Sequence, residues 1–309
     1  MKKILFIFII LLFNCHNAQN IGEMKIQQIP LEKQIAYMID LTLKTPHELY
    51  INDILAVSRS RGSNAAIDIN PYVLKNGKYK IKLRLLPYWH LNETTVSKSD
   101  IENARLFLGS YIRNKETDEI LNYKADVALP IVAPKEDVPY FEQEWDVELT
   151  ELPYELEGWS KGQDLRKWDK DKLEKKVVAY YQKLWHILNN GEGEKWTELT
   201  QKRINETAIF YYESQEENQE AIKNNQQNIE KYCTNNMIPL EDYEMKLYAE
   251  GKLVCLERKT HTKEFNNKSP LDIKGWSPLI RKGKKSGAGY YNILLYLPID
   301  SNEFVIIRK

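Results

Sequence analysis

The pattern of apolar residues changes once along this 309-residue chain, near residues 157–170. Before that point, apolar and polar residues alternate over short runs, most strictly over residues 79–85. Alternation with a period of two is typical of a strand that has one buried and one solvated face. After that point, apolar residues recur at helical spacing before strand-like runs return. We therefore expect an α+β chain of two domains, residues 30–156 and 171–309, joined by a linker over residues 157–170.

The first domain is predicted to be an antiparallel β-sandwich, because its short strand-like runs are not interrupted by a long helical repeat. Asn52-Asp53 and Asn76-Gly77 carry residues that accept the backbone angles of tight hairpin turns. The second of these turns would join residues 70–75 to residues 79–85. Further strands are expected over residues 35–43, 104–112, 120–129 and 141–149.

Residues 50–85 contain a strand, the bend Asn70-Pro71-Tyr72-Val73 and then a Gly-x-x-x-Ile strand, in this order. In this order of elements the segment resembles a piece of galactose-binding-domain-like and related β-sandwiches, with Val73 in the place of a leucine. The resemblance implies a jelly-roll or immunoglobulin-like module, and it carries over no sugar-binding residue.

The second domain is predicted to begin with three helices. Asp171 has the position of an N-cap, with Glu174 three residues later, and Gly191 is suited to end the helix in a left-handed conformation. Two more helices are expected over residues 194–212 and 216–233. The apolar stripe of the first helix consists of Leu173, Val177, Tyr181, Leu184 and Leu188.

Antiparallel strands are expected to close the chain in two hairpins, 243–249 with 252–259 and 290–297 with 303–308. Gly191-Glu192 and Gly193-Glu194 stand between the first two helices. This order of elements and this step resemble the cone-shaped fold of nuclear-transport-factor-like and SnoaL-like proteins over residues 172–309. The resemblance implies helices followed by a curved antiparallel sheet. Such domains serve as enzymes, ligand pockets and association modules, so the fold implies no single function.

The first 18 residues have the form of a secretory signal, with a basic start, an apolar run over residues 4–13 and a short polar stretch. The run is too short for a permanent membrane-spanning helix. We therefore expect an exported bacterial protein that is periplasmic or anchored to the outer membrane. Two processing sites compete, because Cys15 lies where a lipoprotein carries its lipidated cysteine and Ala18 suits ordinary cleavage.

Cys233 and Cys255 remain in the mature chain in either case. In an oxidising compartment they are either joined by a disulfide or buried as two thiols. Neither has a Cys or His neighbour at metal-ligand spacing, so we expect no metal site and no cofactor. The chain has 44 basic and 44 acidic residues, and this balance argues against nucleic acid as a partner.

Residues 158–162 read Gly-Trp-Ser-Lys-Gly and match the nucleophile elbow of serine hydrolases. With Ser160 as nucleophile and His261 as base, Asp242 has the chain position of the acid. The residues before the motif are acidic and contain Pro, unlike the buried strand that an elbow needs. We therefore interpret the segment as a linker and expect no catalytic residue. His186, on the first helix, is expected to be a packed or surface histidine rather than a general base.

Charge is distributed unevenly. Residues 136–157 contain nine acidic residues and no Lys or Arg, whereas residues 258–285 contain nine Lys or Arg and two acids. Such runs usually form solvated faces. Alternatively, the two segments face each other and orient the domains, or one of them docks a partner of opposite charge. Residues 260–289 are a long loop, which favours binding. Its candidate binding residues are Trp276, Arg281, Lys282, Lys284 and Lys285.

Trp89 and His90, beside Tyr88, form a second candidate group, either an aromatic ligand shelf or a patch that covers the end of the sandwich. These observations predict an exported cell-envelope binding protein without catalytic activity. It would engage an envelope or secreted protein, as immunity, accessory and assembly proteins do, and contact a membrane only through a lipid anchor. The alternatives are an enzyme or small-ligand binder that uses the cone-domain pocket, and a glycan-binding module.

Overall fold

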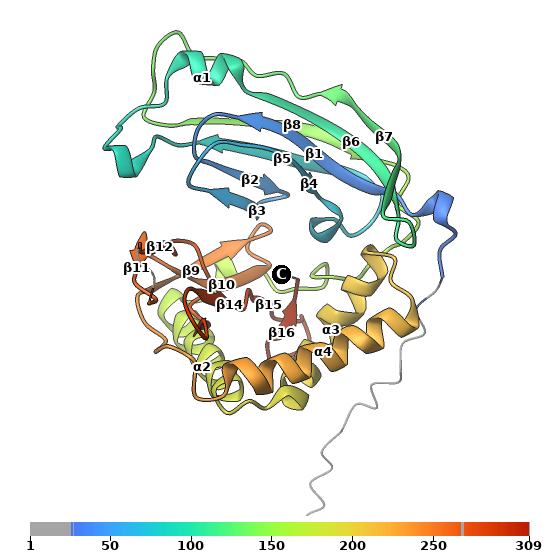
Figure 1. Ribbon diagram of the computed structural model, residues 1–309, viewed down its shortest axis with the longest axis vertical. Helices are drawn as coiled ribbons and strands as arrows, with labels where there is room; N and C mark the ends of the chain where they lie inside the picture. The colour runs from blue at the N-terminus through green and yellow to red at the C-terminus, as the bar shows by residue number, and fades with distance from the viewer. Residues whose placement is uncertain (1–25, 27, 267–268, 309) are drawn as a thin grey trace, which may run out of the picture.

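The computed structural model describes residues 26, 28–266 and 269–308. The signal-like segment, with Cys15 and Ala18, lies outside the described residues. The fold is α+β (Figure 1), with two antiparallel sheets in the N-terminal half and helices plus antiparallel sheets in the C-terminal half.

The N-terminal half contains two four-stranded antiparallel sheets, whose strands overlap in the view of Figure 1. Their facing side chains share one hydrophobic core, which includes Ile39, Leu49 and Ile81. The first sheet has the order β4 (Ser63–Asp68), β1 (Ala36–Leu43), β6 (Arg105–Asn114), β7 (Glu119–Ala128). The second has the order β3 (Ile54–Arg59), β2 (His47–Ile51), β5 (Gly77–Leu85), β8 (Phe141–Leu149). The short helical elements are η1 (Leu31–Lys33), η2 (Asn70–Tyr72), η3 (Trp89–Leu91), α1 (Lys98–Asn103) and η4 (Leu165–Lys167).

The expected strands over residues 35–43, 104–112, 120–129 and 141–149 are present as β1, β6, β7 and β8. The predicted turn between β2 and β3 is confirmed, because Asn52 and Asp53 both have positive φ, 49° and 64°.

The hairpin predicted at Asn76-Gly77 is wrong. Residues 70–72 form η2 instead of a strand, and β5 pairs with β2 and β8. Pro71 has no backbone N–H to donate to a ladder. The Asn70 side chain accepts a hydrogen bond from the Tyr37 backbone N–H (2.9 Å) and donates one to the Ile35 carbonyl (3.0 Å), so it fixes the start of β1.

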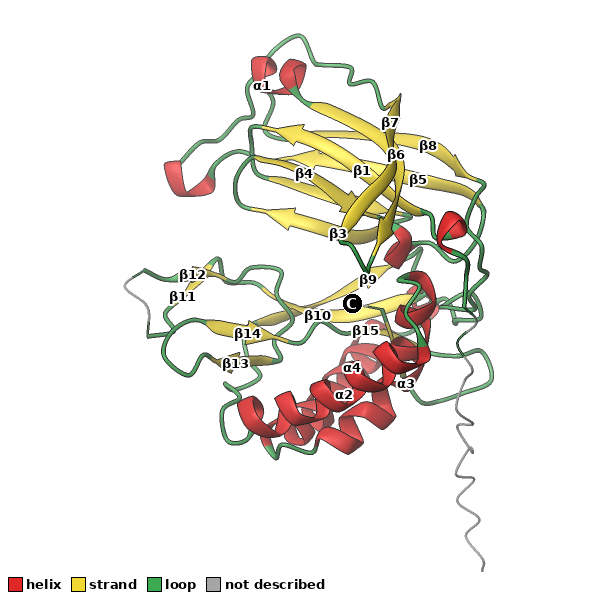
Figure 2. Ribbon diagram, turned by 45° about the vertical axis from the view of Figure 1, so that its right-hand side comes forward, coloured by secondary structure: helices red, strands yellow, loops and turns green. Residues whose placement is uncertain are grey.

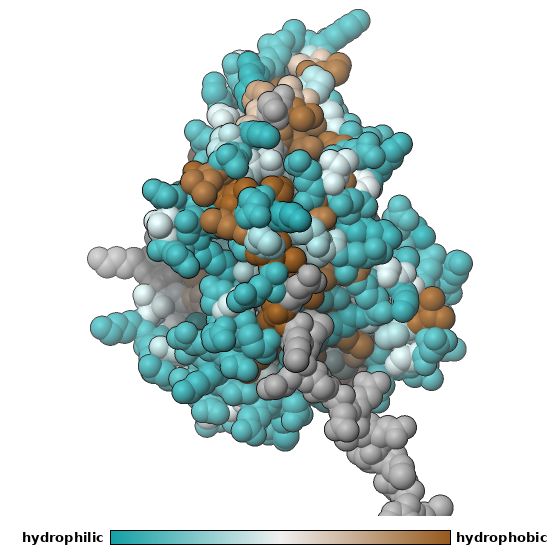
Figure 3. Space-filling view, turned by 90° about the vertical axis from the view of Figure 1, so that its right-hand side faces the viewer, coloured by the Kyte–Doolittle hydropathy of each residue, from teal (hydrophilic) through white to brown (hydrophobic). Residues whose placement is uncertain are grey.

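The edge strand β7 lies on the right-hand side of Figure 1, the side that Figure 3 shows face-on. Its Ile120, Tyr123 and Val127 are each about half exposed (51%, 50% and 51%). The pairing of β6 with β7 shifts register twice, and Asn122 has a φ of 52°. Such irregularities twist an edge strand and hinder its pairing with another chain.

The C-terminal half begins with three helices, α2 (Lys170–Asn189), α3 (Gly193–Phe210) and α4 (Gln215–Cys233). A four-stranded antiparallel sheet follows, in the order β16 (Val305–Ile307), β15 (Leu294–Tyr296), β10 (Leu253–Arg258), β9 (Tyr243–Tyr248). Both predicted hairpins are confirmed within it, although β15 and β16 are shorter than expected. Two small sheets pair β11 (Thr262–Lys263) with β12 (Leu271–Asp272) and β13 (Ile280–Lys282) with β14 (Ala288–Tyr290).

The first long helix begins earlier than predicted. Its N-cap is Asp169 rather than Asp171, and the Asp169 carboxylate accepts a hydrogen bond from the Lys172 backbone N–H at 2.9 Å. Its end is as predicted, because Gly191 has a φ of 71° and its N–H bonds to the Leu188 carbonyl at 3.0 Å.

The C-terminal sheet lies between the helices and the N-terminal half (Figures 1 and 2). Along β10 successive side chains point to opposite faces. Leu253 and Cys255 join the core of the N-terminal sheets, whereas Val254 and Leu256 join the core beneath the helices. The two halves are therefore packed against each other through one sheet.

This packing separates the two described cysteines. Cys255 lies on the face toward the N-terminal half, whereas Cys233 lies in the helical core, where its Sγ is 2.8 Å from Tyr291 Oη. No disulfide joins Cys233 to Cys255. Of the two alternatives for this pair, the structure therefore has the buried thiols and not the disulfide.

Candidate functional site

Within the acidic segment 136–157, the acids of one strand face basic residues of the neighbouring strand. Its strand β8 lies beside β5, whose outward side chains are basic, and the register places Glu142 opposite Arg84. Arg84 Nη2 is 2.6 Å from the Glu142 carboxylate. The other opposed pairs are Lys78 with Glu148, Lys80 with Asp146 and Lys82 with Glu144. Opposite charges facing each other across a sheet stabilise the pairing.

Two further acidic side chains of this segment, Glu155 and Glu157, find partners outside residues 258–285. Glu155 pairs with Lys75 at 2.8 Å, and Glu157 pairs with Lys202 at 2.5 Å and Lys161 at 2.9 Å. The suggestion that the acidic and basic segments face each other is therefore wrong. The acids of β8 instead face the basic residues of the neighbouring strand β5, and composition alone does not reveal this pairing.

The basic segment is divided. Arg258 is buried and its Nη2 lies 3.4 Å from the Asp242 carboxylate, and Lys263 pairs with Glu241 at 2.6 Å. The last basic residues behave differently, because they lie on the hairpin of β13 and β14. The name basic hairpin cluster is used below for four of them, Arg281, Lys282, Lys284 and Lys285, together with Lys231 near the end of α4.

Three members of the basic hairpin cluster surround one aromatic ring at the end of α4. Lys231 Nζ, Arg281 Cζ and Lys284 Nζ lie 5.1, 5.3 and 4.8 Å from the centroid of the Tyr232 ring. Cations at this distance from a ring are attracted by its quadrupole. Among residues 26, 28–266 and 269–308, no carboxylate lies within ion-pair distance of any of the five cations. The cluster therefore presents uncompensated positive charge.

Local structure holds the hairpin in place. The Asn236 side-chain amide donates to the Lys282 carbonyl at 2.7 Å, which ties β13 to the end of α4. Trp276 stacks on Tyr290 of β14, with ring centroids 4.2 Å apart and planes 24° apart. Tyr290 lies opposite Ile280 in the β13–β14 pair, and Trp276 packs against the small core that contains Ile280, so the stacked rings lie beside the hairpin and not among the cations around Tyr232. Lys231, Tyr232 and Tyr290 were not predicted, although the Lys-Tyr pair at the predicted end of a helix was an available signal.

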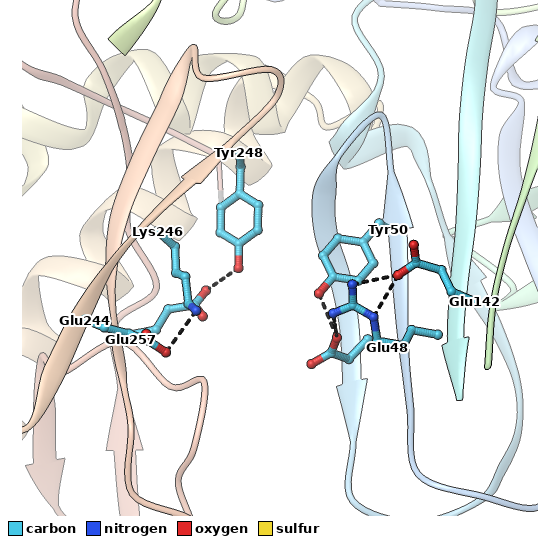
Figure 4. Close-up of polar contacts among 8 residues, drawn as sticks. Glu48, Tyr50, Glu142, Glu244, Lys246, Tyr248 and Glu257 are labelled. Atoms are coloured by element: carbon cyan, nitrogen blue, oxygen red, sulfur yellow. Dashed lines mark hydrogen bonds and ion pairs between the residues drawn. The ribbon is translucent and has the colours of Figure 1, made fainter. Parts of the chain in front are cut away.

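A second site lies between the two halves, as a cleft of about 480 Å³. Figure 4 shows its two walls, which are the outer face of β2 and β5 and the facing side of β9 and β10. On the first wall, Glu48 accepts hydrogen bonds from Tyr50 Oη at 2.7 Å and from Arg84 Nη1 at 3.2 Å. On the second, Tyr248 Oη donates to Glu257 at 2.7 Å.

Contacts between the halves close both ends of this cleft. At one end, the Asp53 carbonyl accepts from the Ala249 N–H (3.4 Å), and its carboxylate accepts from the Glu250 N–H (3.2 Å). At the other end, Trp89 stacks on His261, with centroids 4.3 Å apart and planes 29° apart. The predicted shelf residue Trp89 therefore belongs to this cleft.

Burial governs ionisation in the cleft. It raises the pKa of Tyr50 and of Tyr248 far above the usual range, and the neighbouring carboxylates Glu48 and Glu257 act in the same direction. Both phenols therefore stay protonated and act as donors to these carboxylates. Burial and then the Lys274 ammonium lower the pKa of His261, against the opposing effect of Asp272. His261 is thus mainly neutral at pH 7.

The other histidines and the serine motif have structural surroundings. His90 makes edge contacts with Tyr88 and Trp89, at 5.3 and 5.7 Å between ring centroids, and His186 makes one with Trp185 at 5.2 Å. Ser160 lies in a turn, where its hydroxyl donates to the Glu157 carbonyl at 2.6 Å. No strand precedes this turn directly and no helix follows it directly, so the elbow geometry is absent there.

The linker is anchored from the C-terminal half. Glu206 of α3 accepts a hydrogen bond from the Gly158 N–H at 3.0 Å and pairs with Arg308 at 2.7 Å. The Arg308 guanidinium also lies over the rings of Trp159 and Phe210, 5.4 and 4.7 Å from their centroids. The motif residues therefore fix the junction between the halves.

Within the described residues, no three His, Cys, Asp or Glu side chains are grouped in a way that could hold a metal ion. The described helices include none with the length and apolar character needed to cross a membrane. Comparisons with protein-family models, with curated proteins and with solved structures find no match for this chain.

Proposed function

We propose that this chain is an exported, non-catalytic binding protein of a bacterial cell envelope, and that the basic hairpin cluster docks an acidic surface of a protein partner. The partner is an envelope or secreted protein, of the kind that immunity, accessory or assembly proteins engage. The signal-like first 18 residues support the export part of the proposal.

The observation that carries the proposal is the contrast between the two charged runs. Five of the nine acidic residues of the acidic run lie within ion-pair distance of a lysine or arginine, whereas the basic hairpin cluster has no carboxylate within that distance among the described residues. Unmatched surface charge of one sign steers a partner of opposite sign and suppresses wrong partners. Trp276 and Tyr290 beside the cluster add the kind of aromatic surface that is enriched at protein interfaces.

The scaffold of the proposal is a β-sandwich over residues 30–156 joined to a cone-like domain over residues 171–309. The two stacked four-stranded sheets and the order of three helices before an antiparallel sheet support this assignment. In this arrangement the basic hairpin cluster lies on the C-terminal domain, at the end of α4.

The test is affinity capture of the mature protein from its own cell envelope, followed by mass spectrometry. We expect a stoichiometric protein partner that is lost when Arg281, Lys282, Lys284 and Lys285 are changed to Glu. The matched control changes four cations of η4 and α2 by the same total charge, at Lys167, Lys170, Lys172 and Lys175, and should retain the partner. These control side chains are exposed, and the three on α2 lie in its first two turns.

Loss of the partner in both variants would mean that total charge, rather than this surface, governs binding. Retention in both would contradict the proposal. Raising the salt concentration gives a second readout, because an electrostatic docking surface loses affinity and association rate as the charges are screened.

A further inference from the structure

The cleft between the two halves is built for a ligand that differs from the acidic partner. Its volume of about 480 Å³ lies within the range of roughly 300–1,000 Å³ that small-molecule sites occupy. It lies between the halves, a place where such sites are common. The contacts that close its ends are made by Asp53 with Ala249 and Glu250, and by Trp89 with His261.

The polar groups of the cleft are held in place before any ligand arrives. Glu48 is fixed by Tyr50 and Arg84, and Arg84 is held from its other side by Glu142. On the opposite wall, Glu257 accepts from Tyr248. Side chains that are already oriented lose little conformational freedom when they bind, which favours recognition.

The charges of the cleft select against a strongly charged ligand. Its lining carries four carboxylates and five cationic side chains, so the two signs nearly balance. Glu244 lies directly opposite Glu257 across the β9–β10 pair, and Lys246 holds Glu244 at 2.9 Å. Acceptors and donors therefore alternate over short distances, an arrangement that suits a neutral ligand whose groups both donate and accept.

Aromatic rings and an unsatisfied donor complete this chemistry. Tyr50, Tyr248 and Trp89 line the cleft, and Trp89, which is 37% exposed, offers apolar ring surface. On the C-terminal wall, Arg258 Nε is a buried nitrogen atom with no hydrogen-bond partner among residues 26, 28–266 and 269–308. Buried polar atoms normally have a partner. A ligand rich in hydroxyl groups can supply one here.

We propose that this cleft binds a neutral saccharide. The hydroxyls of a sugar each donate to a carboxylate and accept from a guanidinium or ammonium group, and the C–H face of one of its rings packs on Trp89. This site is separate from the basic hairpin cluster and does not depend on the protein partner.

The test uses the whole mature chain and three neutral probes, maltotriose, chitotriose and cellotriose, with isothermal titration calorimetry and saturation-transfer NMR. We expect saturable binding of at least one trisaccharide. Glu257→Gln and Trp89→Ala should each weaken it about tenfold or more, since each removes a charge-assisted hydrogen bond or a stacking surface. Glu155→Gln, an exposed site outside the cleft, and Lys284→Gln, in the basic hairpin cluster, are the matched controls and should bind normally.

Three results would overturn the proposal. The first is no saturable binding of any of the three trisaccharides at about 10 mM, which corresponds to less affinity than about −3 kcal/mol. The second is unchanged trisaccharide binding in both Glu257→Gln and Trp89→Ala. The third is tighter binding of spermidine than of every trisaccharide, which would mean that the carboxylates select a cation. The far-ultraviolet circular dichroism of each variant, matched to that of the parent, establishes that the variants are folded.

Discussion

The β5–β8 ladder and the basic hairpin cluster are both charged runs in the sequence, but they have opposite roles in the structure. In the ladder, Arg84 pairs with Glu142, and Lys80 lies within ion-pair distance of both Glu144 and Asp146. In the hairpin, Lys282 and Lys285 have no carboxylate within reach among the described residues, and the other cations gather around Tyr232. A charged run thus marks a surface for partners only when the fold does not neutralise it.

The comparison has a physical basis in strand geometry. Successive side chains of a strand point to opposite faces, so every second residue of β5 and of β8 reaches the same solvated face. Neighbouring strands then place opposite charges about 4.5–5.5 Å apart at their Cβ atoms. A short hairpin such as β13–β14, with Lys284 and Lys285 in its turn, has no such neighbour to supply acids.

The largest effect is expected at the buried ion pair of Glu206 and Arg308, whose side chains are 8% and 1% exposed. Glu206→Ala should lower the free energy of unfolding by about 3–5 kcal/mol, because it leaves the Arg308 charge buried without a partner. Urea unfolding measures the change. Glu155→Ala, in an exposed pair with Lys75, is the control and should cause no measurable change. If Glu206→Ala lowers the free energy of unfolding no more than Glu155→Ala does, burial does not determine how much a charge pair stabilises this protein.

A smaller effect is expected within the ladder. Arg84→Ala should lower the free energy of unfolding by about 1 kcal/mol, since both partners are about one-third exposed and water screens their attraction. The double-mutant cycle of Arg84→Ala with Glu142→Ala isolates the coupling, expected near 0.5 kcal/mol. Zero coupling would contradict the view that cross-strand pairing neutralises the acidic run.

A pH dependence should separate the neutralised acids from free ones. The Lys202 ammonium, hydrogen-bonded to Glu157, and then Lys161, lower the pKa of Glu157 to about 2. A lowered pKa stabilises the folded state above the unfolded pKa near 4.5, and this contribution is lost as the pH falls from about 4.5 toward 2. Because the Glu157 side chain is 43% exposed, we expect about 0.5 kcal/mol. Glu157→Gln should flatten the stability curve over that interval, and an unchanged slope there would refute the assignment.

Much of the fold could be predicted from the sequence, because period-two alternation and helical apolar stripes reflect which side chains face the core. The strands β1, β6, β7 and β8, the Asn52-Asp53 turn and the end of α2 at Gly191 were all predicted. The Asn76-Gly77 hairpin failed because Asn70 uses its side chain to bond the start of β1, a long-range contact that no local pattern encodes.

The candidate site was only partly predictable, for the same reason. Arg281, Lys284 and Trp276 were predicted from the charge and the length of their loop. Tyr232, whose ring Arg281 and Lys284 contact, was not predicted because it lies on a different element, α4. The cleft joins Tyr50 and Tyr248, almost two hundred residues apart, and a single sequence contains no signal for that pairing. Trp89 was predicted as a candidate, but its stacking on His261 was not, because His261 lies directly before β11 in the other half of the chain.

The smallest effect on stability is expected at the hairpin. Lys282→Gln combined with Lys285→Gln should change the free energy of unfolding by less than about 0.5 kcal/mol, because neither ammonium lies over Tyr232 or near a described carboxylate. Arg281→Gln with Lys284→Gln is the paired comparison, and it should cost more, since it removes two cations from the Tyr232 ring. Thermal unfolding in parallel with partner capture measures both pairs. If Lys282→Gln with Lys285→Gln destabilises the protein as much as Arg84→Ala does, the hairpin charges stabilise the folded state as the ladder charges do, and the docking proposal loses its basis. If this double variant leaves stability unchanged while capture is weakened, the two charged runs differ in the way that the docking proposal requires.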